Sequence, residues 1–201
     1  MSSDLPSDNL QAGAREAALR LQQAGWTAYW AGGCVRDVIM GRLPKDYDIA
    51  TNATPDDVLR LFPKSVAVGK AFGVVRVPRD GNWYEVATFR QDHAYRDGRH
   101  PEAVTFTDAQ TDAARRDFTV NALFFDPIAG VIHDFVDGRK DIDLKIIRTV
   151  GQPRDRFTED HLRLLRAVRF SATLGFALEP ATAQAIRDLA DRIQRVSAER
   201  I

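Results

Sequence analysis

The sequence predicts an α+β protein, with a mixed or antiparallel sheet and flanking helices over residues 1–140 and an all-helical segment over residues 141–201. Two observations support this division. Short β-rich runs alternate with amphipathic helical patterns up to about residue 140, whereas helical periodicity alone follows. Residues 139–201 also hold 13 basic and 9 acidic side chains, while the formal net charge of the whole chain is zero. A basic excess is typical of a segment that meets phosphate groups, although solvated helix faces give the same count.

Length and composition predict a soluble globular protein. Of the 201 residues, 44% are hydrophobic and 28% are charged, which is enough apolar material for a core. No apolar run approaches the roughly 20 residues of a membrane span, and the first residues lack the pattern of a secretion signal. The single cysteine, Cys34, excludes an internal disulfide, and with four scattered histidines it argues against a structural zinc site. We therefore expect a cytoplasmic protein that does not associate with membranes.

In the first half of the chain, helix and strand signals alternate. Residues 9–24 carry apolar side chains on one helical face, and Gly25 follows as a stop. Thr54 precedes a proline and two aspartates, which is typical of a capped helix start. The expected elements are a helix at 9–24, a strand at 26–31, a short helix at 34–40, a strand that carries Asp46 and Asp48 and ends at Thr51, and a helix that starts at Thr54.

The rest of the chain, from residue 66, begins with a predicted hairpin and ends in helices. The residues at 79–82, Arg-Asp-Gly-Asn, form a turn between two strands. Residues 90–112 are mostly polar, so we expect a long loop that is either functional or disordered. The expected elements are strands at 66–68, 74–77 and 83–89, the loop, a helix-like run from Arg115 that carries Phe118, Val120, Leu123 and Phe124, a strand at 131–135, helices at 158–174 and 180–193, and a further helix capped by Ser197.

The densest group of candidate functional residues lies between Gly32 and Thr51. Asp46 and Asp48 alternate along the expected strand, so their side chains share one face, with Cα atoms roughly 7 Å apart. Two such carboxylates can bind a pair of divalent cations roughly 3.5–4 Å apart, the arrangement that drives in-line phosphoryl transfer. The Gly32-Gly33 turn leaves main-chain N–H groups at a helix start, where a triphosphate can bind. The alternative is that the aspartates are solvated turn residues and the glycines an ordinary turn.

A third carboxylate is expected beside this pair. Glu85 belongs to the expected strand at 83–89. If that strand neighbours the strand of Asp48, Glu85 could complete the metal site or act as a base. The alternative is that Glu85 pairs with Arg76 or Arg90 across the hairpin.

The segment RRDFTVNALFF, residues 115–125, combines polar and apolar side chains in a pattern that suggests a ligand contact. Arg115 and Arg116 could bind a triphosphate as bidentate donors. Asp117 and Asn121 are four residues apart, so on a helix they would share one face and could meet a ribose hydroxyl. The alternative is a capping box with two surface arginines.

The segment EDHLRLLRAVRF, residues 159–170, places Asp160 and Arg163 one helical turn apart. A carboxylate acceptor next to a guanidinium donor complements the pairing edge of cytosine or adenine, which presents an amino donor beside an acceptor. Guanine and uracil present the opposite pattern and would leave buried polar groups unpaired. The alternative is an ordinary Asp-Arg pair on a helix surface.

Five motifs in this order resemble the family of class II tRNA nucleotidyltransferases and bacterial poly(A) polymerases. They are GGCVRDVIMGRLPKDYDIAT, EVATFR, RRDFTVNAL, DGRKDIDLKIIRTVG and EDHLRLLRAVRF, and the resemblance covers residues 29–201. It implies a palm-like nucleotidyltransferase head over 1–140 and a helical neck over 141–201, truncated before the body and tail that hold the tRNA acceptor stem.

The resemblance also implies roles for the candidate residues. Asp46 and Asp48 would bind two Mg²⁺ ions, with Mn²⁺ as a substitute. Asp117 and Asn121 would contact the ribose, and Asp160 and Arg163 would select CTP and ATP. The remaining arginines would contact the triphosphate or belong to the neck: Arg36, Arg115, Arg116 and Arg166.

The implied activity is the template-independent addition of CMP and AMP from CTP and ATP to an RNA 3′ end, most naturally that of tRNA. In relatives, a loop at the position of residues 90–112 helps to switch the pocket from CTP to ATP, and CC-adding members lack it. Its presence therefore argues against CC addition alone. CCA addition, A addition alone and poly(A) synthesis stay open, and so does an RNA- or nucleotide-binding module with little activity. Protein partners are not specified by the sequence.

Overall fold

The computed structural model describes residues 6–95, 101–197 and 199, and a mixed seven-stranded sheet lies at its centre. Its strands are β1 (Ala28–Ala31), β2 (Asp48–Thr51), β3 (Val66–Gly69), β4 (Val74–Arg79), β5 (Asn82–Thr88), β8 (Leu123–Asp126) and β9 (Val131–Asp134). They lie in the order β3-β4-β5-β2-β1-β8-β9. Neighbours are antiparallel except β2 and β5, which are parallel.

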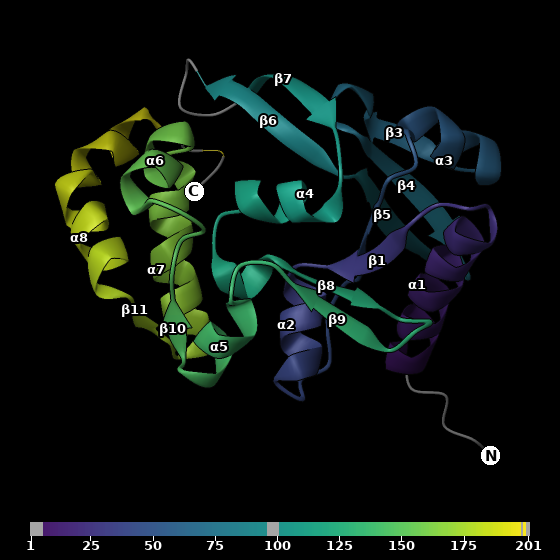
Figure 1. Cartoon of the computed structure of the whole chain (residues 1–201), viewed down its shortest axis with the longest axis horizontal. Helices are drawn as coiled ribbons and strands as arrows, with labels where there is room; N and C mark the ends of the chain where they lie inside the picture. The colour runs from purple at the N-terminus through teal and green to yellow at the C-terminus, as the bar shows by residue number, and fades with distance from the viewer. Residues whose placement is uncertain (1–5, 96–100, 198, 200–201) are drawn as a thin grey trace.

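Helices and two small strand pairs surround this sheet (Figure 1). The α-helices are α1 (Pro6–Gln23), α2 (Gly33–Ile39), α3 (Pro55–Leu61), α4 (Ala109–Arg115), α5 (Gly138–Asp143), α6 (Pro153–Glu159), α7 (Leu162–Leu174) and α8 (Pro180–Asp188). Single 3₁₀ turns occur at η1 (Lys70–Phe72) and η2 (Thr119–Asn121), with a longer 3₁₀ segment at η3 (Ala190–Arg195). The strand pairs are β6 (Arg90–Tyr95) with β7 (Pro101–Phe106), and β10 (Ile146–Ile147) with β11 (Ala177–Leu178). This architecture confirms the predicted α+β class.

The first half of the chain folds largely as its local signals predict. Thr54 caps α3 in a capping box with Asp57, whose main-chain N–H donates to Thr54 Oγ1. The Asp80-Gly81 turn joins β4 to β5 with positive φ at both residues, +48° and +79°, as a two-residue hairpin loop requires. Gly25 follows α1 with a φ of +91°. Each of these signals depends on neighbouring residues alone, and so it can be recognised in the sequence.

The loop expected at residues 90–112 is wrong for most of its length. Residues 90–95 and 101–106 pair as the antiparallel ribbon β6–β7, and α4 begins at Ala109. The pattern is polar because neither ribbon face is packed into a core: His93 pairs with Thr105 on an exposed surface, 2.7 Å apart. A ribbon of this kind lacks the alternation of apolar and polar residues that marks a strand. Residues 96–100 lie outside the described residues.

The helix-like run expected from Arg115 is also wrong. The chain is extended at Arg116 and Phe118, turns through η2 and continues as β8. Phe118, Val120, Leu123 and Phe124 are fully buried, so their spacing reflects a segment enclosed on all sides and not one helical face. Phe118 forms a bridge with Thr149 instead of a helical hydrogen bond.

The helix expected at 158–174 is interrupted. α6 ends at Glu159, Asp160 is extended with φ −142° and ψ 110°, and α7 starts at Leu162. The Asp160 carboxylate accepts a hydrogen bond from the Leu162 N–H at 3.0 Å, a local contact that competes with helix continuation. The helix expected at 180–193 ends at Asp188 and continues as η3. The helix expected after Ser197 falls largely outside the described residues.

Helices α6, α7 and α8 stand together at one end of the molecule, beside the sheet (Figure 1). Phe157 and Leu164 from these helices belong to the same buried cluster as Ile49 and Val86 of the sheet. The predicted boundary between residues 140 and 141 falls inside α5. We keep the division into a head and a neck as a proposal. Among the described residues, no helix is both long and apolar enough to cross a membrane.

Candidate active site

One cleft of about 600 Å³ gathers the residues that the sequence singled out. It lies where the C-terminal end of β1, the start of β2, the segment after α4 and the start of α7 meet. Of the predicted site residues, only Glu85 is not part of its lining. The predicted residues in the lining are Gly32, Gly33, Arg36, Asp46, Asp48, Arg115, Arg116, Asp117, Asn121, Asp160, Arg163 and Arg166.

Asp46 and Asp48 both reach this cleft, although they are not on one strand. β2 begins at Asp48, and Asp46 belongs to the preceding turn, so the predicted alternation along a strand is wrong for Asp46. Burial raises the pKa of Asp48 to about 6, and the negative charges of Asp46 and Glu85 add to this effect, while Arg116 opposes it. A carboxylate whose charge is disfavoured in this way is suited to a divalent cation, which would offset the repulsion.

Glu85 lies near this acid pair but faces a second cleft, of about 370 Å³, which Asp46 and Asp48 also line. In the parallel register of β2 and β5, Ile49 lies beside Val86, so Asp48 and Glu85 occupy adjacent positions on neighbouring strands. The predicted neighbourhood of the two strands is therefore confirmed. Glu85 also lies opposite Arg76 in the β4–β5 register, so a pairing with Arg76 stays open as well.

The Gly32-Gly33 turn leads into α2 and comes close to the arginines of the cleft. Gly32 has a φ of +75°, and a Cβ atom there would lie 3.2 Å from Arg116 Nη1. Arg36, on α2, is buried and donates from Nη1 to Asn121 Oδ1 at 2.5 Å. Because a guanidinium is only a donor, this bond leaves the Asn121 NH₂ group for another acceptor.

Asp117 and Asn121 face the same cleft without sharing a helix. Asp117 Oδ2 accepts from Arg166 Nε at 2.7 Å and forms an ion pair with Arg166 Nη2 at 2.6 Å. Its Oδ1 accepts from the Phe118 N–H at 2.8 Å. The Asp117 and Arg166 side chains, two predicted ligand contacts, therefore bind each other and connect the segment after α4 to α7.

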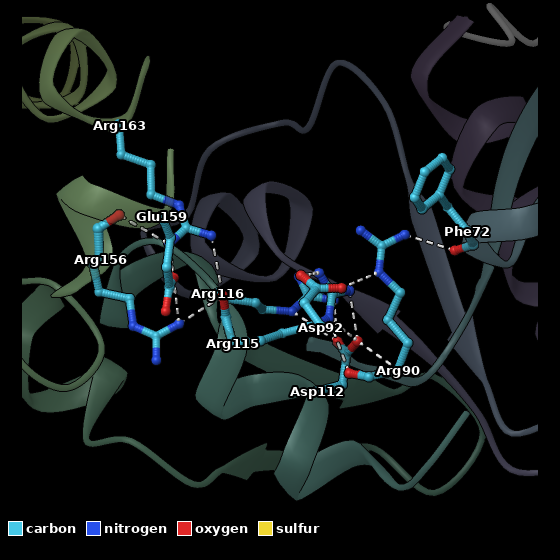
Figure 2. A network of polar contacts seen from close by, with 9 residues as sticks. All are labelled: Phe72, Arg90, Asp92, Asp112, Arg115, Arg116, Arg156, Glu159 and Arg163. Carbon is cyan, nitrogen blue, oxygen red and sulfur yellow. Dashed lines mark hydrogen bonds and ion pairs between the residues drawn. The ribbon is translucent and has the colours of Figure 1, made fainter. Parts of the chain in front are cut away.

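Asp112 organises Arg115 and Arg116, and the sequence analysis gave it no role (Figure 2). Its Oδ1 accepts from Arg115 Nε at 2.8 Å and Nη2 at 2.6 Å, and its Oδ2 accepts from Arg116 Nε at 3.0 Å. Asp112 is 1% exposed. Burial favours its neutral form, but the guanidinium groups of Arg116 and Arg115 outweigh burial and hold its pKa below the usual value. The spacing in DAARR, an acid three and four residues before two arginines, was the available signal.

The network continues from Arg115 to the β6–β7 ribbon (Figure 2). Arg115 Nη1 lies 3.5 Å from Asp92 Oδ2, and Arg90 Nε lies 2.9 Å from Asp92 Oδ1. Arg90 also donates from Nη1 to the carbonyl oxygen of Phe72 at 2.6 Å. The base of the ribbon is therefore connected by ion pairs to an arginine that lines the cleft.

At its other end the network reaches Arg163 (Figure 2). Arg163 Nη1 donates to Glu159 Oε2 at 2.5 Å, and Arg156 Nη1 donates to the same oxygen at 3.0 Å. Both arginines also donate to the main-chain carbonyl of Arg115, at 3.4 Å from Arg163 and 3.3 Å from Arg156.

The predicted helical pair of Asp160 and Arg163 needs a correction. Both residues line the cleft, but Asp160 is extended and precedes α7, and its carbonyl oxygen accepts from the Arg163 N–H at 3.0 Å. Glu159, four residues before Arg163, is the carboxylate that orients the guanidinium. The sequence analysis gave Glu159 no role, although the spacing of Glu and Arg in EDHLR indicates such a pair.

Comparison with known proteins finds relatives along most of the chain. The family model described as "Poly A polymerase head domain" matches residues 28–148, and the model described as "Probable RNA and SrmB- binding site of polymerase A" matches residues 175–201. The chain is 49% identical over 183 residues to the CCA-adding enzyme of Geobacillus stearothermophilus and 49% identical over 181 residues to that of Bacillus subtilis. Each alignment covers 90% of this chain and 45% of the relative.

Solved structures show the same relation. The CCA-adding enzyme of Bacillus stearothermophilus in complex with CTP superimposes with a TM-score of 0.86 at 45% identity, over 98% of this chain and 47% of that chain. A tRNA nucleotidyltransferase complexed with a primer tRNA and an incoming ATP analog gives 0.70 at 26% identity, over 88% of this chain and 50% of that one. The chain therefore spans about half the length of the curated relatives it matches.

Proposed function

Because this chain belongs to the family of class II CCA-adding enzymes and poly(A) polymerases, we propose that it adds CMP and AMP from CTP and ATP to the 3′ end of tRNA without a nucleic-acid template. The observation that carries the proposal is the cleft of about 600 Å³. Three segments far apart in the sequence contribute to it an acid pair, an arginine pair and the start of α7. These are the parts that nucleotidyl transfer needs: charge for the phosphates, a nucleophile-activating centre and a base-reading surface.

The acid pair fits divalent cations. Mg²⁺ is usually bound by one or two carboxylates and completed by substrate phosphates and water, and Asp46 and Asp48 line the cleft together. Asp46 and Asp48 would hold two Mg²⁺ ions, or Mn²⁺ in their place. When bound, such ions lower the pKa of the attacking 3′-hydroxyl and neutralise charge on the leaving pyrophosphate. Glu85, next to Asp48, is proposed as the third carboxylate.

The remaining residues would position the nucleotide. Arg115 and Arg116, held by Asp112, would bind the triphosphate together with Arg36 and the Gly32-Gly33 turn. The Asn121 NH₂ group would donate to a ribose oxygen, and Asp117 would accept from a ribose hydroxyl. Asp160 and Arg163 would read the pairing edge of cytosine or adenine. Arg166 would act through Asp117, to which it is bonded.

Two alternatives within the family differ in the product. Poly(A) synthesis is supported by the family description and would give long A tracts on many RNAs. CCA addition is supported by the names of the relatives and by the bound CTP in the solved structure of one of them. The single cysteine, Cys34, supports the cytoplasm as the proposed compartment.

The test is extension of a tRNA that lacks its terminal CCA, with Mg²⁺ and each NTP, followed by product sequencing. We expect addition of C, C and A in this order with CTP and ATP, and none with GTP or UTP. Long A tracts on unrelated RNA would favour poly(A) synthesis. An absence of any extension by the chain would leave an RNA- or nucleotide-binding module as the better description. Asp48→Ala should abolish extension while the circular dichroism spectrum stays unchanged.

A further inference from the structure

The second cleft adjoins the nucleotide cleft along the acid pair. Asp46 and Asp48 line both clefts, so the two clefts meet at the acid pair. The second cleft, of about 370 Å³, takes the rest of its wall mainly from the β4–β5 hairpin, and it includes Arg76 and Trp83. Its lining differs from that of the nucleotide cleft, because it holds a tryptophan and one arginine where the nucleotide cleft holds five arginines.

The hairpin register explains this arrangement. Glu85 lies opposite Arg76 and adjacent to Asp48, on three neighbouring strands. Successive side chains of a strand alternate between its faces, so Trp83 lies on the same face of β5 as Glu85. The distance from Asp48 to this tryptophan is therefore about one strand spacing across and two residues along the sheet, or roughly 8 Å.

Trp83 and Arg76 form an exposed aromatic and cationic pair. Trp83 is 48% exposed, and the Arg76 guanidinium carbon lies 5.3 Å from the centroid of its ring. A base can stack on such a ring, while a guanidinium beside it can reach a phosphate or stack as well. A surface cation–π pair without a ligand is the alternative.

The chemistry of transfer decides which ligand occupies the second cleft. In an in-line displacement the attacking oxygen and the leaving oxygen lie on opposite sides of the phosphorus atom. The arginines that would hold the triphosphate, and hence the leaving pyrophosphate, all line the first cleft. The attacking 3′-hydroxyl therefore has to approach the phosphorus atom from the side away from these arginines, and the second cleft, which shares the acid pair, offers space next to the reacting phosphate.

We infer that Trp83 and Arg76 form a stacking platform for the unpaired 3′ end of the acceptor RNA. The inference rests on the proposed function and deepens it, because it assigns the acceptor strand to residues of the β4–β5 hairpin. The base next to the acids stacks on Trp83, and Arg76 binds the adjacent phosphate. Lys45, which also lines this cleft, adds positive charge on the side of the acid pair.

Binding measured without catalysis tests this site. The probe is a short single-stranded RNA that ends in CC, followed by fluorescence anisotropy in Mg²⁺ without nucleotide. Loss of one stacked base corresponds to about a tenfold weaker Kd, so we expect this change or more for Trp83→Ala. Trp83→Phe should retain most of the affinity, because phenylalanine can also stack. Trp83→Leu should behave like alanine, because leucine covers the hairpin surface but has no π system.

The phosphate contact proposed for Arg76 is tested by the salt dependence of RNA binding. Removal of one phosphate contact reduces the slope of log K against log salt by about 0.7 for a single strand. We expect this reduction for Arg76→Ala and an unchanged slope for Arg60→Ala, a control on α3 whose side chain is 77% exposed. The Kd for CTP, measured without RNA, should stay at the wild-type value in all these variants.

The outcomes separate this inference from the proposed function. Unchanged RNA affinity in Trp83→Ala would overturn the platform, even if the wild-type chain extends tRNA. An equal loss of CTP and RNA affinity would overturn it too, because it would show a general structural effect. Weaker RNA binding in Trp83→Ala and Trp83→Leu with normal CTP binding supports the platform, even if the wild-type chain extends no tRNA and the proposed function fails.

Discussion

The carboxylate of Asp112 is shared by Arg115 and Arg116, the two arginines expected to bind the triphosphate. Sharing restricts both guanidinium groups to one orientation, with Arg116 also packed over the ring of Phe124, 4.8 Å from its centroid. The position of such groups affects the reaction rate strongly, because a misplacement of about 1 Å can lower the rate about a hundredfold. The consequences of losing Asp112 should therefore exceed those of losing an ordinary surface acid.

Asp112→Asn should lower kcat/KM at least tenfold for CTP and for ATP, and leave the ratio of the two unchanged. The asparagine is similar in size but cannot serve as a charged acceptor for two guanidinium groups. Stability should fall by about 2 kcal/mol, less than for a fully buried ion pair because both arginines are partly solvent-accessible. Steady-state kinetics and urea denaturation measure the two effects. Asp56→Asn, which removes an exposed ion pair with Lys70, is the control. A changed ratio of the kcat/KM values for CTP and ATP in Asp112→Asn would contradict a role in positioning alone.

Asp48 should be a destabilising residue when no metal is bound. Its folded-state pKa of about 6 lies above the usual value of 3.8, so the carboxyl ionises more easily in the unfolded chain. The protein therefore loses stability as the pH rises from about 3.8 to about 6, and the full loss is present above pH 6. Asp48→Asn should then raise the free energy of unfolding at pH 8 by about 1 kcal/mol, a figure kept small because solvent reaches this residue from the cleft. The gain should shrink as the pH falls through 6, since the wild-type carboxyl then binds a proton.

Denaturant titrations in EDTA at pH 8, 6 and 5 check this prediction. Asp57→Asn provides a control of opposite sign. Hydrogen bonds from Thr54 hold the pKa of Asp57 below its usual value, so its loss should destabilise the protein at pH 8. A gain for Asp48→Asn that does not depend on pH would contradict the argument.

Among the elements, the junction of α6 and α7 carries Asp160 and Arg163, the two residues proposed to read the base. Glu159 is the last residue of α6, Arg163 lies in the first turn of α7, and Asp160 is extended between the two helices. The interruption turns the main chain at Asp160, so a carboxylate and a guanidinium from different local structures can line one cleft. In a continuous helix, the carboxylate of Asp160 and the guanidinium of Arg163 would lie on the same helix face.

Arg163→Ala should relax nucleotide choice, because the guanidinium proposed to read the base is lost while the arginines proposed to bind the triphosphate remain. We expect incorporation of UTP and GTP to rise relative to CTP and ATP by at least tenfold, measured by competition and product sequencing. Arg169→Ala, at an exposed position of the same helix, is the control. An unchanged preference for CTP and ATP would contradict the base-reading role of Arg163.

The elements also show which features a sequence can predict. Thr54 and the Asp80-Gly81 turn were recognised because their effect is local. The helix expected from Arg115 was wrong because Phe118 and Leu123 are completely buried, and complete burial removes the difference between helical and strand spacing. Glu159, which binds Arg163, was not among the predicted residues because Glu159 and Asp160 are adjacent acids, four and three residues before the same arginine. The candidate site residues were chosen by their chemical types and order, so the errors in the expected elements did not change that choice.

Across the whole molecule, one buried cluster joins the sheet to the C-terminal helices. Phe157 and Leu164 are fully buried in it together with Phe118 and Ile147. The cleft lies between the two parts, so its shape depends on how they pack. Head and neck should therefore unfold together.

Phe157→Ala should shift the unfolding of the entire chain. A fully buried phenylalanine replaced by alanine costs about 3–5 kcal/mol. The three tryptophans, Trp26, Trp30 and Trp83, all lie in the first 140 residues, so their fluorescence reports on the head alone. We expect the urea midpoint of tryptophan fluorescence to fall together with that of the far-ultraviolet circular dichroism. A fluorescence midpoint that stays at the wild-type value would show that the neck unfolds independently.

The carbonyl oxygen of Arg115, which accepts from both Arg156 and Arg163, has a consequence for mutation. A base change in codon 115 can replace the side chain and break the ion pairs with Asp112 and Asp92, but every amino acid retains this oxygen. The hydrogen bonds that Arg163 makes there are therefore tolerant of missense changes at residue 115. A lineage could lose the Arg115 side chain and recover it by reversion, while Arg163 kept its main-chain acceptor throughout.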